Sequence, residues 1–173
     1  MKVKSRQILR SGAENKRRKI LAGIIVVSVL AIAGVITYSM FLKYEPPKFE
    51  VNAVAGTPTP EKNYLYGELE SGFGYKVSLA SNLYQQEDRT LKIYLTNPST
   101  NKVNLMCEVR SVDDDELLYE SGLLHPGEYV ESLDPKGDFD NIKYDVNVII
   151  YAFEPESYQS AGSTTLKLVL QPW

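Results

Sequence analysis

Acidic side chains gather in two short stretches of the chain, and clustered carboxylates are groups that could bind a cation. Calcium needs six to eight oxygen ligands that converge on one point. The stretch 134–141 lacks the spacing of an EF-hand loop, and Lys136 lies among its candidate ligands. We therefore expect a solvated loop there, with three weak calcium candidates, Asp134, Asp138 and Asp140. The second stretch, 113–116, predicts a solvated hairpin turn.

The chain has one histidine and one cysteine, which limits the catalysis that it could perform. A triad in its usual form or a site with several histidine ligands is not available. His125 precedes Pro126-Gly127 and is expected in a surface loop. Cys107 stands at an inward-facing position and is expected to be a small buried side chain. We predict a protein that is not an enzyme and uses no cofactor.

One predicted strand carries apolar side chains at positions that should point away from the core. These positions alternate with the core positions along 144–153, and neighbouring strands would add two more apolar residues. The predicted partner-binding patch consists of Met106, Ile149, Tyr151, Phe153 and Val169. Exposed apolar patches mark interaction surfaces. Two alternatives stay open: a bulge could rotate half of the strand inward, or the segment before the domain or the loop 154–158 could cover the patch.

The elements that would position these residues follow from alternation of apolar and polar residues from about Tyr64 onward. A period of two predicts strands with one buried face, and no window after Tyr64 shows a convincing helical period. Turn-forming pairs such as Asn97-Pro98 and Pro126-Gly127 separate the strands. The predicted strands are 64–70, 75–79, 91–96, 103–110, 116–121, 128–133, 144–152 and 164–170.

Seven or eight short strands within one domain predict an all-β fold, specifically an antiparallel β-sandwich. A domain of this length can bury a sufficient core without disulfides. The predicted core residues are Leu91, Ile93, Leu95, Val103, Leu105, Cys107, Val109, Val146, Val148, Ile150, Leu166, Leu168 and Leu170.

Two segments carry a resemblance to known modules: Leu123-Leu-His-Pro-Gly-Glu-Tyr129 and Tyr144-Asp-Val-Asn-Val148. They resemble fibronectin type III and immunoglobulin-like domains, and Tyr144 suits a tyrosine corner, whose hydroxyl bonds to upstream backbone. The whole layout looks like that of small single-pass surface proteins of Gram-positive bacteria, with Glu120–Tyr129 as the matching segment. The resemblance implies an immunoglobulin-like ectodomain and brings no catalytic motif. The chain departs from antibody domains in having no cysteine pair and no core tryptophan.

Residues 20–42 form an apolar stretch without one charged residue or proline, long enough for a helix across a bilayer. The preceding 19 residues carry eight Lys or Arg and one acid, whereas 44–173 carry ten Lys or Arg and 21 Asp or Glu. Because short basic flanks stay in the cytoplasm, we predict a cytoplasmic N-terminus and an extracellular C-terminal domain. A cleaved signal peptide is the alternative, although this stretch is longer than a signal peptide's apolar region.

The prolines between the apolar stretch and the first strand predict an extended stalk. The expected organisation is a basic tail at 1–19, a transmembrane helix at 20–42, a Pro-rich stalk at 43–63 and a β-sandwich at 64–173. The acidic outer domain argues against nucleic acid as a partner. We predict a membrane-anchored module that binds a protein of the cell envelope. The alternatives are a structural spacer in a membrane complex and a module that binds calcium or carbohydrate.

Overall fold

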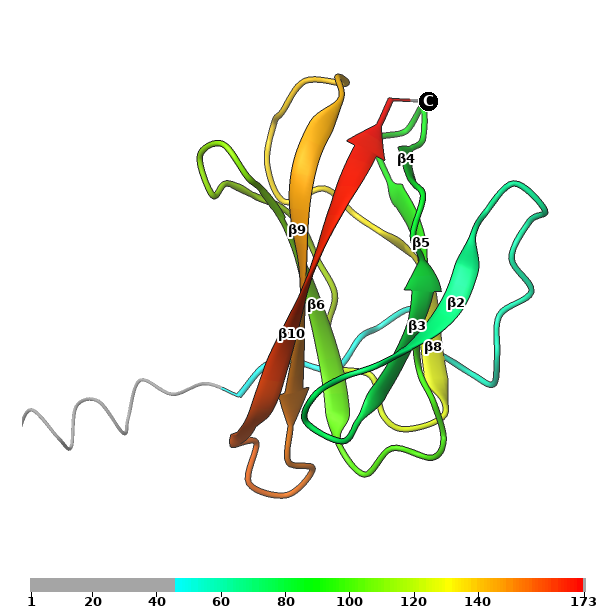
Figure 1. The fold of residues 1–173 in the computed structure, drawn as a ribbon, viewed down its shortest axis with the longest axis vertical. Coiled ribbons are helices and arrows are strands. Elements are labelled where there is room, and N and C mark those ends of the chain that lie inside the picture. Colours follow the sequence, from blue (N-terminus) through cyan, green and yellow to red (C-terminus); the bar gives the residue numbers. More distant parts are fainter. Residues whose placement is uncertain (1–45, 173) are drawn as a thin grey trace, which may run out of the picture. The chain divides into compact units, whose positions relative to one another are not determined.

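β-strands make up the regular structure of residues 46–172, the range that the computed structural model describes (Figure 1). No helix lies in this range. The strands are β1 (Val54–Ala55), β2 (Tyr66–Glu70), β3 (Lys76–Ala80), β4 (Leu83–Gln85), β5 (Leu91–Asn97), β6 (Asn104–Ser111), β7 (Leu117–Glu120), β8 (Glu128–Leu133), β9 (Tyr144–Phe153) and β10 (Ser160–Gln171). The prediction of an all-β domain is confirmed for this part of the chain.

Eight of these strands lie where alternation predicts them, and two short ones were not predicted. β1 has two residues and β4 has three, too few to show a period. Both exist because of pairing with distant segments: β1 pairs with β8, and β4 pairs with β5 and β10. The number of described strands is therefore ten rather than seven or eight.

The strands join into one curled, mixed sheet, which corrects the prediction of a purely antiparallel one. The hydrogen-bonded order is β1-β8-β5-β4-β10-β9-β6-β7, with β3 also on β5 and β2 on β3. β4 and β10 run parallel, with Leu83 opposite Leu170 and Tyr84 opposite Gln171. Parallel pairing joins segments far apart in sequence, so no local turn signal announces it.

Figure 1 shows the curled sheet as two facing layers, with β6, β9 and β10 in one and β2, β3, β5 and β8 in the other. The space between them holds the main apolar core. Ten of the thirteen predicted core residues are fully buried. The other three, Val103, Leu166 and Leu168, are half-buried and pack against the core from its margin.

A second apolar cluster lies apart from the main core and is built from tyrosines. The ring of Tyr64 contacts Tyr94 at 5.2 Å and Tyr84 at 5.9 Å between centroids, both edge to face. Tyr94 has a φ of 52°, at a point where the register of β5 against β8 shifts. Successive residues of β5 point to opposite faces, so Ile93 enters the main core while Tyr94 enters the second cluster. Part of the tyrosine-rich composition is thus structural.

The hydroxyl groups of two buried tyrosines donate to backbone carbonyls across the domain. Tyr119 donates to the carbonyl of Arg89 at 3.0 Å, and Tyr75 to that of Ile150 at 3.3 Å. Tyr144, which was predicted to make such a corner bond, instead packs its ring edge-on against Phe139 at 6.1 Å. Among residues 46–172, Tyr75 and Tyr119 thus make the kind of hydroxyl-to-backbone hydrogen bond that the sequence predicts for Tyr144.

Burial of Tyr119 should make the domain sensitive to alkali. Desolvation raises the pKa of Tyr119 above its ordinary value of 10.0, since the charged phenolate is poorly solvated in the core. The unfolded chain loses this proton first as pH rises, so stability is full below pH 10 and falls above it. Chemical unfolding at about pH 9 and about pH 11 should show a smaller loss of unfolding free energy in Tyr119→Phe than in the wild type. An equal loss would contradict this assignment.

The segment predicted as the end of the stalk is part of the folded unit, which begins at Pro47. Phe49 bridges to Leu123, and the Glu50 N–H donates to the Leu123 carbonyl at 2.9 Å. Farther along, β1 pairs with β8. The prediction of a free stalk up to residue 63 is corrected from Pro47 onward, because edges of the sheet supply hydrogen-bond partners that a proline-rich composition does not reveal.

The predicted tail at 1–19, the predicted transmembrane helix at 20–42 and residues 43–45 lie outside the described residues, as does Trp173. Among residues 46–172, no helix has the length and apolarity needed to cross a bilayer.

Candidate functional site

The central strand of one layer, β9, positions the predicted patch. β9 lies between β6 and β10, and its side chains alternate between buried and half-buried. Ile149, Tyr151 and Phe153 occupy successive half-buried positions, whereas Ile150 and Ala152 between them are fully buried. The alternation continues to the end of the strand, so no bulge turns the three side chains inward. They form one row on the outer face of the layer, which we call the β9 row.

The other two residues of the predicted patch do not extend the β9 row. Met106 lies opposite Tyr151 but is only 8% exposed. Val169 lies opposite Asp145, whereas the β10 residue opposite Tyr151 is Ser163. Six residues along a strand span roughly 20 Å, and Lys167 and Asn147 lie between. The predicted patch of five residues is thus reduced to a row of three.

Met106 lies in a cleft that the segment predicted as stalk helps to form. A cleft of about 410 Å³ lies between the segment 47–52, the end of β7 and the residues that follow β8, and Met106 lines it. Glu50 forms one wall, where its carboxylate accepts from the Gly122 N–H at 2.7 Å. Lys136 and Glu120 form an ion pair of 3.1 Å in the opposite wall. Met106 therefore lies in this cleft and not on the open surface, and the segment 47–52 lines the cleft, as the covering alternative anticipated for part of the patch.

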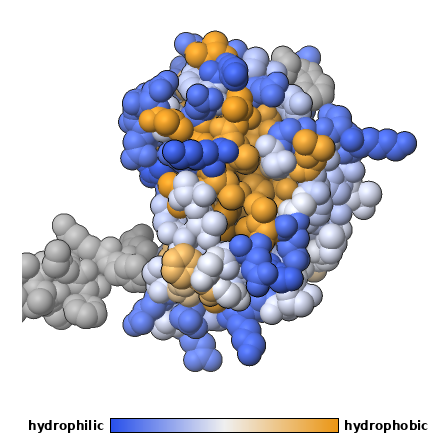
Figure 2. Space-filling model, in the orientation of Figure 1, coloured by the Kyte–Doolittle hydropathy of each residue, from blue (hydrophilic) through white to orange (hydrophobic). Residues whose placement is uncertain are grey.

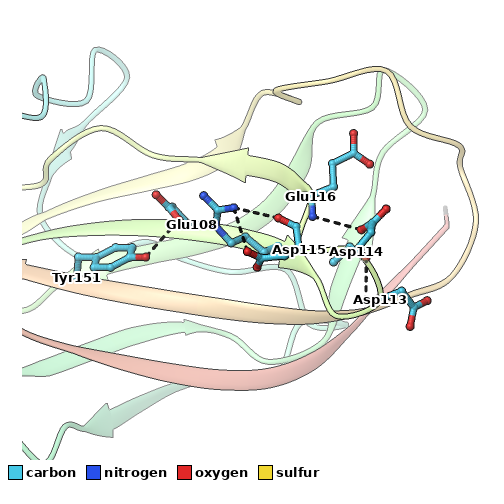
Figure 3. Close-up of polar contacts among 8 residues, drawn as sticks. Glu108, Asp113, Asp114, Asp115, Glu116 and Tyr151 are labelled. Carbon is cyan, nitrogen blue, oxygen red and sulfur yellow. Dashed lines mark hydrogen bonds and ion pairs between the residues drawn. The ribbon is translucent and has the colours of Figure 1, made fainter.

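Polar residues of β6, which the sequence pattern did not single out, lie beside the β9 row. The Tyr151 hydroxyl donates to the Glu108 carboxylate at 3.3 Å, and the Arg110 Nε donates to the same oxygen at 2.7 Å (Figure 3). The side chains of Arg110 and Glu108 are 26% and 14% exposed, so water screens the pair only in part. Burial, followed by the charge of Glu108, raises the pKa of Tyr151, which therefore stays a neutral donor at physiological pH.

Spacing along β6 was the signal that could have found these residues. Glu108 and Arg110 follow Met106 at intervals of two, so they share its face of the strand. The register then places Glu108 opposite Ile149 and Arg110 opposite Asn147. The β9 row is thus an aromatic and aliphatic strip with a fixed ion pair along one side. Such an arrangement, apolar in the middle and polar at the rim, is typical of protein-binding surfaces.

The acidic stretch 113–116 forms the turn between β6 and β7, as predicted. Side chains in and beside this turn bond to its backbone: Asp114 accepts from the Glu116 N–H at 3.2 Å, and Ser111, the last residue of β6, accepts from the Asp113 N–H at 3.3 Å (Figure 3). Hydrogen bonds, first that from Ser111, lower the pKa of Asp114. Asp115 adopts a φ of 59°, and its carbonyl accepts from Arg110 at 3.0 Å. The turn is thus held by polar groups of its own and of the end of β6.

The three weak calcium candidates, Asp134, Asp138 and Asp140, have different surroundings. Asp138 forms an ion pair of 2.8 Å with Arg89, whose guanidinium also donates to the Phe139 carbonyl at 2.8 Å. Asp134 lies at the cleft beside the segment 47–52, and Asp140 is exposed. Within residues 46–172, no three side chains of His, Cys, Asp or Glu come together in a way that could hold a metal ion.

The lone cysteine and the lone histidine have structural surroundings. Cys107 is fully buried in the main core, and burial raises the pKa of its thiol. His125 is exposed after the end of β7, where its ring stacks on Phe49 at 4.1 Å between centroids. Both positions agree with the expectations of a buried cysteine and a surface-loop histidine.

Comparison with known proteins finds no relative of this chain. No protein-family model, no curated protein and no solved structure matches the chain.

Proposed function

We propose that the chain is a membrane-anchored, non-enzymatic binding module of the bacterial cell envelope, whose domain recognises a protein partner through the β9 row. The apolar stretch 20–42 would anchor it, and the basic residues before that stretch favour a cytoplasmic N-terminus. The acidic domain would then lie outside the membrane.

The strand order supports an immunoglobulin-like sandwich for this domain. In the constant type of that fold, strands A, B, E and D form one sheet and strands C, F and G the other. No strand takes the place of D within residues 46–172, because β7 pairs with β6. Here β3, β5 and β8 would take the places of A, B and E, while β6, β9 and β10 would take those of C, F and G. Such sandwiches serve many binding functions by presenting a sheet face or loops, so the fold alone does not name the partner.

The observation that carries the proposal is the β9 row itself. Ile149, Tyr151 and Phe153 point to one face of the central strand of a layer, half-exposed and side by side. Aromatic side chains are enriched at the centre of protein interfaces, because they bury large areas at a small cost in side-chain entropy. The ion pair of Glu108 and Arg110 supplies a polar rim that could specify the orientation of a partner.

A photo-crosslinking amino acid at position 151, in the full chain in its own membrane, tests the proposed surface. We expect one discrete protein adduct, identified by mass spectrometry, whose yield falls several-fold when Ile149→Ala is added. The matched control places the same crosslinker at Glu131, an exposed position of β8 in the other layer. Equal adducts from both positions, or none from position 151, would overturn the β9 row as the binding surface.

A further inference from the structure

The last strand has one edge that is largely unpaired. Along one side, β10 pairs with β9 from Ser160 to Leu170. Along the other side it pairs with β4 only at Leu170 and Gln171. Within residues 46–172, no strand pairs with this second edge from Ser163 to Val169. Every second residue of that stretch therefore directs its backbone N–H and C=O away from β9, as a template for another strand.

The open edge has a defined boundary at each end. Near its start, Phe73 lies so close to Gly162 that a Cβ built there would be 2.8 Å from the ring. The Tyr75 hydroxyl also contacts the Thr164 hydroxyl at 3.1 Å, on the core side of the strand. At the other end, β4 begins to pair at Leu170. The open edge thus consists of the seven residues Ser163–Val169, with Leu166 in the middle.

The core is incompletely covered beside the open edge. Leu166 and Leu168 point to the core side of β10 but are only half-buried, in contrast to Leu170, which β4 covers completely. Figure 2 shows apolar side chains in the middle of this face of the molecule, between polar side chains. An added strand would bury this apolar margin as well as satisfy the free backbone groups.

We propose that the open edge of β10 pairs with the same edge of a second copy of this chain, antiparallel and about a two-fold axis at Leu166. In this register Leu166 faces its own copy, Thr165 faces Lys167 of the second copy, and Ser163 faces Val169. The register uses every residue of the open edge. A two-fold contact of this kind is self-complementary and closes at two copies.

Charge selects this register over its neighbours. Lys167 and Thr165 are exposed, and within the described residues Lys167 forms no ion pair. A two-fold axis at Lys167 would place two lysines directly opposite each other, which is destabilising. A two-fold axis at Thr165 would pair Val169 with Ala161 of the second copy. Ala161 lies beyond the open edge, at the bulge next to Gly162, where Phe73 is in the way. The axis at Leu166 avoids both problems.

A charge-swap experiment tests the proposal on the full-length chain in detergent micelles, by sedimentation equilibrium over a range of concentrations. Thr165→Lys would set two pairs of lysines opposite each other and should raise the dimer dissociation constant about tenfold. Adding Lys167→Glu to that variant turns both pairs into opposite charges, and the constant should return to within about threefold of wild type. Thr100→Lys, which adds the same charge in an exposed turn, should leave the constant unchanged.

Two results would overturn the proposal: a wild-type chain that stays monomeric, or a dimer that Thr165→Lys does not weaken. Hydrogen exchange of the wild type provides a test without a substitution, because amides within 163–169 should gain protection as the concentration rises. If the exchange rates of these amides did not change with protein concentration, the open edge would be excluded as the dimer contact. The result is independent of the proposed partner surface, since Ile149→Ala should leave the dimer intact while it removes the adduct formed at position 151.

Discussion

Replacing Gly122 with alanine is expected to lower the free energy of unfolding by about 3 kcal/mol, near the upper end for overpacking. A Cβ at this position would lie 2.5 Å from the Glu50 nitrogen and 2.7 Å from the Phe49 carbonyl carbon. These are backbone atoms, so a change of rotamer cannot relieve the contact. The segment 47–52 would have to move away, and the hydrogen bond between the Gly122 N–H and Glu50 would be lost.

The matched control is Gly67→Ala in β2, where a Cβ would meet no atom within 4 Å. Its unfolding free energy should stay within about 0.5 kcal/mol of wild type. Urea unfolding of the full-length chain measures both variants. Similar losses in the two variants, or none in Gly122→Ala, would show that the N-terminal segment does not pack against Gly122 in solution.

Two adjacent isoleucines of β9 should lose stability to very different extents when each is replaced with alanine. Ile150 is fully buried between the layers, so Ile150→Ala removes core volume and should cost about 3 to 4 kcal/mol of unfolding free energy. Ile149 is half-buried on the outer face, so Ile149→Ala should cost about 1 kcal/mol. Thermal unfolding compares the two stabilities.

The same pair separates stability from binding. Ile149→Ala should abolish most of the partner adduct at position 151 while the domain stays folded. A large loss of stability from Ile149→Ala, equal to that from Ile150→Ala, would place both side chains in a core and would contradict the assignment of an outer face to the β9 row.

Alternation of side chains was sufficient to locate the long strands. In β6 and β9 each core position that the sequence marks, from Leu105 to Val109 and from Val146 to Ile150, is fully buried. The reason is local, because successive residues of a strand point to opposite faces whatever partner the strand finds. The same logic gave the three residues of the β9 row, since a strand without a bulge keeps its alternation.

Side-chain alternation was not sufficient to predict the burial of residues that contact distant segments of the chain. Met106 has an outward position on β6 but is buried in a cleft that the segment 47–52 helps to line. Leu166 and Leu168 have inward positions but are half-buried, because β4 pairs with only the end of β10. In each case the facing direction was local information, whereas coverage depended on a segment far away in the chain.

By itself, the sequence determined which segments form the long strands, which side of each strand faces the core, and that the acidic stretch 113–116 is a turn. Only the tertiary structure decided that the segment from Pro47 onward packs on the domain, that β4 joins β10 in parallel, and that Asp138 pairs with Arg89. The physical reason is that period and turn chemistry are properties of neighbouring residues. Edge pairing, coverage and ion pairs arise between residues that the chain brings together only when the sheet curls.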